Sequence, residues 1–498
     1  MLRMSLSVLL AAPLAAQGPR PAPEAIARAV DSLATRIVAA KLTPGLGVAL
    51  VMDGKTVFAK AYGMADADKR IPADGRTLWY IASTTKSYTG FGISLLAHQG
   101  VLRLDQSIAS LLPGTTWHAG VDPNQLTLAQ FLSHTHHLND NAIVQSAAFT
   151  GEIPEARWPE LLRLAQPSGN SDLVYSNFGY NVAAMVIDAK RKEGWRRFLD
   201  SAVHAPAGLR ETYTRLSGLD PARIAVPHAL KADGSYAAVP FFKTDATMNS
   251  AGGHVATLTD LARWVTVQMD GGKIDGKQVF PAPAVALSHT MIAPHTVAQS
   301  KRFAVFDREG WAAGWDIGRY EGEPMVSRFG SYASIRSHLS WLPRRRIGFV
   351  AQVNGRPGWN ATDLIAAYAY DLEAGKPNAR ATMEQRLQQL TAPLANGLRQ
   401  IATNDSTRAA RQVPLPRPLS EYAGSYGHDV YGTVTFAEQN GVLTFKWGAL
   451  SSPVEVFDAA KDILRVEIVG SGTTVLFRFD GPGPARVIEL QGVSFTRK

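Results

Sequence analysis

Apolar residues near the start of the chain recur at helical spacing and then change to a β-like pattern. Residues 25–41, AIARAVDSLATRIVAAK, carry apolar positions three and four residues apart, which predicts a helix. Residues 45–63 contain two β-rich runs on either side of Asp53-Gly54, a dipeptide that favours a tight hairpin turn. The chain is therefore expected to open with a helix and a β-hairpin.

A second group of strands follows much later. Residues 311–354 return to strand-like runs and residues 361–374 predict a helix, whereas helical and loop material lies between the two strand groups. Strands at both sequence ends, with helices between them, predict one sheet built from both ends of a domain. We place this α/β (α+β) domain at residues 22–378, with an antiparallel sheet flanked by helices and an additional all-helical region.

The pattern changes again after a Pro-rich stretch at residues 412–419, QVPLPRPL. Residues 431–447, YGTVTFAEQNGVLTFKW, alternate apolar and polar positions on both sides of Asn440-Gly441, which is a strong hairpin signal. Three further strand-like runs follow, separated by Gly and Pro. The pattern predicts a helical segment and linker over residues 379–415 and a small all-β barrel or sandwich over residues 416–498.

Composition narrows the chemistry. The chain has 498 residues, of which 46% are hydrophobic and 19% charged, an ordinary globular balance. It contains no cysteine, which excludes a disulfide scaffold, a thiolate metal site and a cysteine nucleophile. The formal net charge is +9, but the only dense basic cluster is Arg344 to Arg346, so we expect no nucleic-acid partner. The positive charge favours acidic surroundings such as an anionic cell envelope.

The N-terminus has the pattern of a secretory signal peptide over residues 1–17. Arg3 precedes an apolar run, Leu6 to Ala16, that is too short to span a bilayer, and small residues then lead into a polar, Pro-rich stretch. A periplasmic or secreted location is therefore expected, and an amphipathic N-terminus is the alternative. No later segment is long and apolar enough to predict a membrane span.

Ser83 and Lys86 lie three residues apart at the start of an apolar, helix-like run. On a helix these positions share a face, and a lysine held among apolar neighbours has a lowered pKa and can act as a base toward serine. The spacing alone is weak, because a chain of this length contains about one such pair by chance. A solvated lysine at a helix end is the alternative.

Two further segments carry candidate chemistry. In VYSNFGYN, Tyr175 could relay a proton and the Asn177 amide could hold a substrate carbonyl, although a buried aromatic turn would look the same. In SRFGS, Arg328 and Gly330 are expected on a strand, where the glycine lets a ligand approach the backbone. The N–H after that glycine, at Ser331, can serve as an oxyanion donor.

Taken in this order, the motifs resemble the serine β-lactamase-like superfamily, which includes class C β-lactamases, D,D-carboxypeptidases, D-aminopeptidases and esterases. The resemblance covers roughly residues 25–375, and the C-terminal β unit resembles the lipocalin-like domain often appended to such hydrolases. Five segments appear in the family's order: TPGLGVALVMDGKTVFAKAYGMAD, LTLAQFLSHT, VYSNFGYNVAAMVI, NSAGGHVATLTDLARWV and RIGFVAQVN.

The resemblance implies a role for each matching residue. It implies Ser83 as the acyl-forming nucleophile and Lys86 as its general base. It implies that Tyr175 passes a proton to the leaving group and activates water for deacylation, and that Asn177 binds substrate. The backbone N–H groups of Ser83 and Ser331 are implied as the oxyanion hole.

The chain departs from the family at the strand motif. Relatives have Lys or His followed by Thr-Gly or Gly-Gly, whereas this chain has Arg328-Phe329-Gly330. Arginine keeps the positive charge but does not release a proton near neutral pH, so it could hold a substrate carboxylate or lower the pKa of Tyr175. Phe329 replaces a hydroxyl that β-lactam enzymes often use, which disfavours β-lactam hydrolysis.

A second departure is SHTHHL, where relatives have Ser-Gly after the Thr. His134, His136, His137 and Asp140 raise the alternative of a zinc site, but their spacing does not match a metallo-β-lactamase pattern. His134 lies where the family has a structural histidine, and His136 and His137 could reshape a loop near the pocket. We therefore expect no metal and no cofactor.

The sequence thus predicts a serine hydrolase that forms an acyl-enzyme on small ester or amide substrates, D-amino-acid peptides included. The alternatives are β-lactamase or penicillin-binding activity, and a non-catalytic binding protein on the same fold. Its expected partner is a small molecule or short peptide. A further hypothesis is that the C-terminal β domain caps the cleft and sets the size of the substrate.

Overall fold

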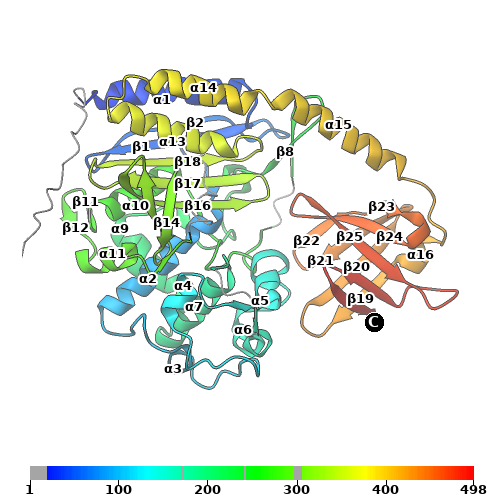
Figure 1. Ribbon diagram of the computed structural model, residues 1–498. Helices are drawn as coiled ribbons and strands as arrows, with labels where there is room; N and C mark the ends of the chain where they lie inside the picture. Colours follow the sequence, from blue (N-terminus) through cyan, green and yellow to red (C-terminus); the bar gives the residue numbers. More distant parts are fainter. Residues whose placement is uncertain (1–19, 170–172, 240–242, 297–304) are drawn as a thin grey trace, which may run out of the picture.

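The structure is a computed structural model that describes residues 20–169, 173–239, 243–296 and 305–498 (Figure 1). The predicted signal peptide lies outside the described residues. The helix predicted near the start is α1 (Pro23–Ala39), which begins with proline in its first turn, where a missing N–H costs nothing. Its core-facing positions are three and four residues apart: Ile26, Val30, Leu33 and Ile37.

A nine-stranded antiparallel sheet forms the centre of the main unit (residues 20–378). As expected, it is built from both ends of the unit, because β18 pairs with β1 in a register that places Val350 opposite Ala49. The strand order is β13-β14-β15-β16-β17-β18-β1-β2-β3. The bounds are β1 (Gly45–Met52), β2 (Lys55–Asp66), β3 (Ile71–Pro72), β13 (Ala293–Pro294), β14 (Asp307–Trp311), β15 (Asp316–Tyr320), β16 (Glu323–Tyr332), β17 (Ile335–Leu342) and β18 (Ile347–Val353).

The β1–β2 hairpin turns at Asp53-Gly54, as predicted. Asp53 has a φ of 50° and Gly54 a φ of 78°, and two consecutive positive φ angles are what a tight hairpin turn of the primed type requires. The same turn recurs in the C-terminal unit at Asn440-Gly441, with φ angles of 53° and 76°. Local turn chemistry therefore determined both hairpins.

Helices cover the two faces of the sheet with separate cores (Figure 1). On one face α1 packs with α13 (Trp359–Glu373) and α14 (Ala379–Thr391). On the other lie α2 (Thr85–His98), α10 (Leu258–Met269) and α11 (Ala282–His289). Among the described residues no helix has the length and apolar character needed to cross a membrane.

The expected helical region lies beneath α2 and supplies the rest of that core. It consists of short helices and small strand pairs. The helices are α3 (Ile108–Leu111), α4 (Leu128–Leu132), α5 (Asn141–Gln145), α6 (Trp158–Leu161), α7 (Phe178–Lys190), α8 (Gly194–Leu199) and α9 (Ala205–Ala207). The strands are β4 (Trp79–Tyr80), β5 (Leu138–Asn139), β6 (Gln166–Pro167), β7 (Thr212–Tyr213), β8 (His228–Leu230), β9 (Tyr236–Ala238), β10 (Val255–Ala256), β11 (Lys273–Ile274) and β12 (Lys277–Gln278).

The C-terminal strands form a nearly closed nine-stranded barrel with its own core. Side chains alternate between inside and outside, so that Leu443, Phe445 and Trp447 on β21 point inward. The backbone N–H of Glu467 donates to Ser452 Oγ at 3.0 Å and links β24 to β22 across the seam. The bounds are β19 (Gly424–His428), β20 (Gly432–Gln439), β21 (Val442–Trp447), β22 (Leu450–Pro453), β23 (Glu455–Asp458), β24 (Ile463–Ile468), β25 (Ser471–Arg478), β26 (Val487–Leu490) and β27 (Val493–Arg497).

Two features join the barrel to the main unit. The helix α15 (Leu394–Ala410) runs between them and is followed by α16 (Leu419–Tyr422) at the barrel (Figure 1). The barrel also rests directly on the helical region, where the backbone N–H of Ala449 donates to the carbonyl of Thr150 at 2.7 Å. The side chains of Phe149 and Tyr332 pack against the barrel core. The barrel is therefore held by direct contacts as well as by the chain connection.

Replacing Asp363 by Asn is expected to destabilise the main unit by about 3 kcal/mol, because it leaves the largely buried guanidinium of Arg336 without its carboxylate. Asp363 on α13 accepts from Arg336 at 2.9 and 3.0 Å and from His338 Nδ1 at 2.9 Å. Burial would raise the pKa of this carboxyl, but Arg336 and His338 lower it to about 2. Denaturant unfolding measures the difference, with exposed Asp405→Asn as a control expected within about 1 kcal/mol of the parent.

The pKa of Asp363 in the folded state lies below the ordinary value of 3.8. Its contribution to the free energy of unfolding is therefore complete above pH 4 and is lost as the pH falls toward 2. The difference in the free energy of unfolding between the parent and the Asp363→Asn variant should therefore shrink over that pH range. A difference that stays constant with pH would contradict this account.

Candidate active site

The segment that carries Ser83 is held in an uncommon backbone conformation. A short 3-10 turn, Ala82–Thr84, precedes α2, and Ala82 has a φ of 47°, which is costly for a residue with a β-carbon. The N–H of Ile81 donates to the carbonyl of His254, which holds the segment from behind. Strain of this kind persists only where the surrounding structure enforces it, and here it presents Ser83 at the start of α2.

Lys86 lies on the first turn of α2 and is completely buried. Its Nζ lies 3.2 Å from Ser83 Oγ, 2.7 Å from Asn177 Oδ1 and 2.7 Å from the carbonyl oxygen of Ala251. The predicted i, i+3 contact between Ser83 and Lys86 is therefore present. The three neighbours come from three different segments of the chain.

The protonation state of Lys86 decides what this geometry can do. Burial, together with the charge of Arg328, lowers the pKa of the Lys86 amine to about 8, although Tyr175 opposes the shift. A neutral amine has two N–H donors and one lone pair. With Asn177 and Ala251 accepting the two donors, the lone pair is left for the hydroxyl proton of Ser83.

Tyr175 lies beside Lys86 and is 44% exposed, so solvent or a substrate can reach it. Its Oη accepts a hydrogen bond from Arg328 Nη2 at 2.9 Å, and Lys86 Nζ lies 4.9 Å from its ring centre. Burial of the hydroxyl raises its pKa, but the charges of Lys86 and Arg328 outweigh this effect and lower the pKa of Tyr175 to about 8. Tyr175 and Lys86 thus titrate in the same range and can exchange a proton.

Arg328 is 2% exposed, and its guanidinium contacts three neighbouring groups. Besides Tyr175, its Nε donates to the carbonyl of Ser83 at 2.9 Å, and its Nη1 lies 3.6 Å from Asp316 Oδ2. Its guanidinium also faces the ring of Trp311 at 5.1 Å. Of the two roles open to this arginine, the contacts support lowering the pKa of Tyr175 rather than holding a substrate carboxylate.

Phe329 lies on the opposite face of β16 from Arg328. It packs in the core shared with α1 and α13, where its ring contacts His338 at 4.6 Å between centroids. The site therefore lacks the hydroxyl found in β-lactam enzymes, but the Phe329 ring does not fill the space in front of Ser83.

Gly330 permits the closest approach in the site. The β15 pairing of β16 stops at Ser327, so the residues beyond it border the Ser83 segment instead. A β-carbon on Gly330 would lie 2.1 Å from the carbonyl oxygen of Ile81 and 2.9 Å from the backbone nitrogen of Ser83. Ser331, next along the strand, is exposed. The strand thus brings its backbone alongside the N–H of Ser83, as the predicted oxyanion hole needs.

The histidines of the segment SHTHHL have different neighbours, and His134 is the one that contacts the Tyr175 segment. His134 Nδ1 accepts from the N–H of Ser176 at 3.2 Å, and its ring lies 4.6 Å from that of Tyr175. Burial, with the nearby positive charges, holds the pKa of His134 well below its usual range. His136 stacks on Phe131. Within the described ranges, no group of three or more His, Asp or Glu side chains could hold a metal ion.

His137 and Asp140 also have structural surroundings. His137 has a φ of 53°, and its carbonyl accepts from the N–H of Ser168. Asp140 caps the start of α5 by accepting from the N–H of Ile143 at 2.8 Å.

Sequence reasoning missed three contributors: the Ala251 carbonyl, Trp311 and Asp316. A backbone carbonyl carries no side-chain signal, although Ala251 falls in the segment NSAGG. Trp311 and Asp316 read as ordinary strand residues in the sequence, and only the fold brings them to Arg328.

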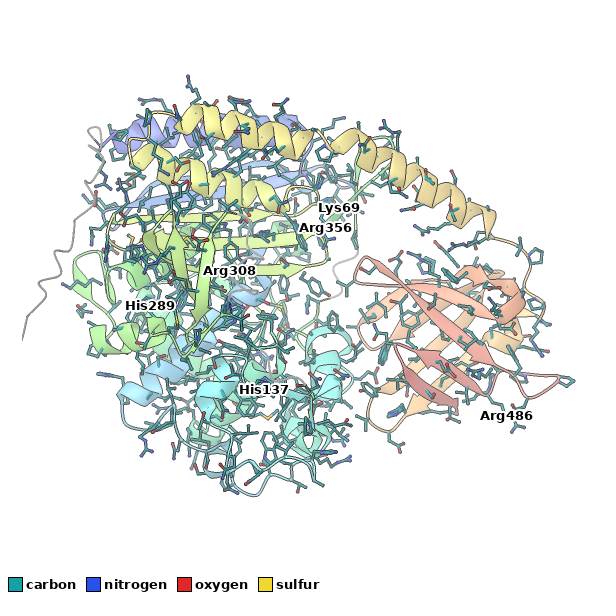
Figure 2. The ribbon with its side chains drawn as sticks, in the orientation of Figure 1. Lys69, His137, His289, Arg308, Arg356 and Arg486 are labelled. Carbon is teal, nitrogen blue, oxygen red and sulfur yellow. The ribbon has the colours of Figure 1, made fainter. Side chains whose placement is uncertain are left out.

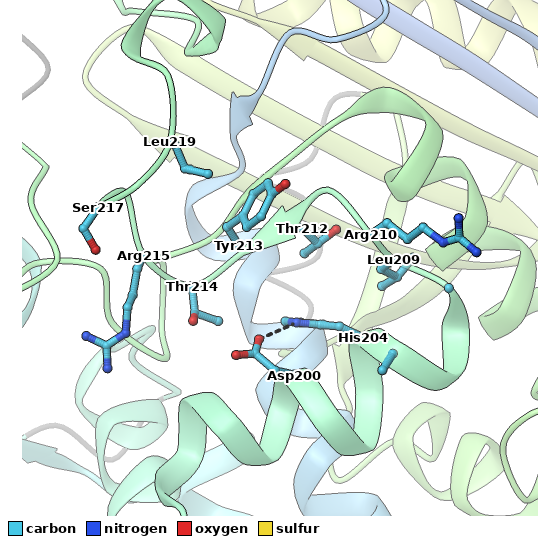
Figure 3. Close-up of a pocket in the computed structure, with 12 residues that line it drawn as sticks. Asp200, His204, Leu209, Arg210, Thr212, Tyr213, Thr214, Arg215, Ser217 and Leu219 are labelled. Carbon is cyan, nitrogen blue, oxygen red and sulfur yellow. Dashed lines mark hydrogen bonds and ion pairs between the residues drawn. The ribbon is translucent and has the colours of Figure 1, made fainter.

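A separate cavity lies elsewhere in the main unit. It has a volume of about 640 Å³ and is lined by Asp200, His204, Arg210 and Arg215 among others (Figure 3). His204 Nδ1 and Asp200 Oδ1 are 3.0 Å apart there. Neither Ser83 nor Lys86 lines it. The catalytic candidates therefore do not lie in this cavity, despite its size.

A family model described as Beta-lactamase matches residues 30–373, the sheet and the helical region together. The chain belongs to the Beta-lactamase family. The matched region contains every one of the candidate residues described above.

Individual relatives of this Beta-lactamase family protein are distant. It is 22% identical over 317 residues to Protein flp of Staphylococcus aureus (strain NCTC 8325 / PS 47), a match that covers 62% of this chain and 59% of that relative's length. The octameric penicillin-binding protein homologue from Pyrococcus abyssi superposes with a TM-score of 0.59 and 18% identity, over 94% of this chain and 99% of that chain. The D-amino acid amidase from Ochrobactrum anthropi SV3 superposes with a TM-score of 0.58 and 20% identity, over 70% and 99% of the two chains. At these identities the structural likeness establishes the fold.

Replacing Gly330 by Ala is expected to slow reaction of Ser83 with a fluorophosphonate by about 100-fold, an effect of the size seen when an oxyanion donor is lost. The added methyl group would push β16 away from the backbone of Ile81 and Ser83. Labelling kinetics measure this, with circular dichroism to confirm folding. Gly75→Ala is the matched control, because a β-carbon there meets nothing within 4 Å. Equal rates of labelling in the Gly330→Ala and Gly75→Ala variants would contradict the close approach of β16 to the Ser83 backbone.

Proposed function

We propose that this Beta-lactamase family protein is a serine hydrolase that forms an acyl-enzyme at Ser83 and acts on small ester or amide substrates, with D-amino-acid derivatives among the amides. The observation that carries the proposal is the contact between Lys86 Nζ and Ser83 Oγ, 3.2 Å apart, in a buried setting that lowers the pKa of the amine. A neutral amine at hydrogen-bond distance is the activated arrangement that serine needs.

In the first step, Ser83 Oγ attacks the substrate carbonyl carbon while its proton moves to Lys86. The N–H groups of Ser83 and Ser331 stabilise the oxyanion, and the remaining amide N–H groups of Asn177 can donate to a substrate carbonyl. Tyr175 gives its proton to the departing alcohol or amine. Lys86 then restores that proton, and the acyl group is left as an ester on Ser83.

In the second step, a water molecule replaces the leaving group. Tyr175 takes a proton from the water, with its own proton held on Lys86, and the hydroxide adds to the acyl carbon. Collapse of the intermediate releases the carboxylic acid and returns the proton to Ser83. The matched pKa values of Tyr175 and Lys86, each about 8, suit a pair that passes one proton back and forth.

The substrate class rests on two supports. The D-amino acid amidase of Ochrobactrum anthropi has the same fold, and its solved structures are complexes with L-phenylalanine amide, L-phenylalanine or D-phenylalanine. In addition, Arg328 is engaged by Tyr175, Ser83 and Asp316, so it is not free to anchor a carboxylate on the substrate. We therefore rank small esters and neutral amides above β-lactams.

Replacing Ser83 by Ala should abolish fluorophosphonate labelling, and Lys86→Met should reduce hydrolysis by about 10³-fold or more, because the serine loses its base. Turnover of p-nitrophenyl acetate, a D-alanyl amide and a chromogenic cephalosporin measures the effect and ranks the substrates. Ser201→Ala is the control, since this serine is exposed and only bonds locally to the carbonyl of Phe198.

Each outcome separates the candidate functions. Cephalosporin turnover faster than that of the ester and amide would reverse our ranking in favour of a β-lactamase. If the folded protein binds these compounds but does not turn them over, the Ser83→Ala variant has no turnover to lose. The protein would then be a non-catalytic binding protein.

The value of kcat/KM should rise with pH to a maximum near pH 8 and fall above it, because Lys86 must have lost its proton to accept one from Ser83, whereas Tyr175 must still hold the proton that it gives to the leaving group. Arg328→Gln is expected to move this maximum to higher pH by about one unit, because the positive charge of Arg328 lowers the pKa of both Lys86 and Tyr175. Arg328→Lys keeps the charge and should keep the pH of the maximum, at a lower maximal rate. An unshifted profile in Arg328→Gln would show that this charge does not tune the pair.

A further inference from the structure

A cavity of about 480 Å³ lies along α15, where this helix leaves the main unit for the barrel (Figure 1). Its volume is within the range of roughly 300–1,000 Å³ that small-molecule sites occupy. The candidate catalytic residues do not line it. Its walls are mostly apolar and come from β8, the loop after β18, the end of α14 and α15 itself: Ala229, Leu230, Pro357, Leu390, Pro393, Leu394, Gly397 and Ile401.

The α15 side of the cavity is an uncovered apolar ridge. Leu394 and Ile401 line the cavity from α15, about two helical turns apart, yet each is only half-buried, and none of the 17 residues of α15 is fully buried. A ridge of this length extends about 10 Å along the helix. Apolar surface that is left open inside a formed cavity favours an apolar ligand.

Arg356 is the charged residue of the cavity lining. It lies in the part of the main unit over which α15 passes (Figure 2), and its guanidinium stacks on the ring of Trp359 with 3.8 Å to the centroid. Among the described residues it has no carboxylate within ion-pair distance. The stacked arrangement fixes the plane of the guanidinium while its N–H donors stay available, which suits a carboxylate.

We propose that this cavity binds a medium- or long-chain fatty acid, with the alkyl chain along the Leu394–Ile401 ridge and the carboxylate on Arg356. A linear chain matches a narrow apolar wall about 10 Å long, and an anionic head matches Arg356, the charged residue of the lining. This site is separate from Ser83 and does not depend on the proposed hydrolase activity.

Calorimetric titration with laurate below its micelle concentration tests the proposal. Laurate should bind with one site per chain. Dodecanol, with the same chain and no charge, should bind at least fivefold more weakly, and butyrate, with the same head group and a short chain, should show no measurable binding. Arg356→Gln should lower the affinity for laurate at least fivefold, so that laurate no longer binds more tightly than dodecanol. Leu394→Asp should lower the affinity for both long-chain ligands at least tenfold. Arg399→Gln, an exposed arginine on α15 outside the cavity lining, should change neither.

The absence of cysteine from the chain allows the site to be located directly. A single cysteine at Gln400, which lines the cavity, should react with a thiol reagent several-fold more slowly when laurate is present. A cysteine at Ala402, exposed and outside the lining, should react equally with and without laurate. Circular dichroism of each variant establishes that it is folded before its reactivity is compared.

Several results would overturn the proposal. Laurate binding that is unchanged by both Arg356→Gln and Leu394→Asp would place the ligand elsewhere, and so would equal reactivity of the Gln400 cysteine with and without laurate. Binding only to anionic phospholipid vesicles, without binding of monomeric laurate, would identify a membrane surface as the occupant. A dimer that dissociates on Leu394→Asp, together with no laurate binding, would identify a second copy of the chain.

Discussion

The buried amine of Lys86 is the group around which the active-site segments are arranged. An amine that is removed from water must have each of its hydrogen-bonding positions satisfied, or it costs several kcal/mol. Here the two acceptors are Asn177 Oδ1 and the carbonyl of Ala251, and the turn before α2 brings the Ser83 hydroxyl to the remaining position of the amine. These contacts join three separate segments of the chain at one nitrogen.

The surrounding charges adjust this arrangement. Arg328 lies close enough to lower the pKa of Lys86 and of Tyr175, while Asp316 partly balances it from the neighbouring strand. Gly330, two residues further along the same strand, lets β16 approach the backbone of Ser83 closely. Arginine at position 328 supplies a permanent positive charge. In the proposed mechanism a proton moves between Lys86 and Tyr175, and the charge of Arg328 lowers the pKa of both groups.

The barrel and α15 give the molecule a second level of organisation. The barrel contacts the main unit at Phe149 and Tyr332, and Tyr332 directly follows Ser331 on β16. Lys243 is buried against the same two rings, and burial lowers its pKa to about 7. The barrel therefore touches the strand that borders the active site, which is compatible with the hypothesis that it limits the substrate. By contrast, α15 leaves apolar surface open, which makes it the least complete part of the packing.

Local sequence patterns determined much of the architecture. The period of apolar residues in α1, the Asp53-Gly54 and Asn440-Gly441 turns and the inside–outside alternation of the barrel strands are all consequences of a few neighbouring residues. The sheet built from both chain ends was also predictable, as was the contact between Ser83 and Lys86, because i and i+3 positions meet on any helix. The limits of the units at residues 378 and 416, and the signal peptide, stay predictions.

Only the tertiary structure decided the rest. Nothing near Ala251 in the sequence shows that its carbonyl accepts from Lys86, since a backbone group has no side-chain identity. Arg328 had two possible roles, and the fold favoured one by placing Tyr175 and Asp316 within its reach. Packing across elements likewise places the ring of His134 against Tyr175 and that of His136 against Phe131. Residues close in sequence share an element, whereas packing decides which groups meet across elements. In this site packing thereby lowers the pKa of Lys86 and of Tyr175.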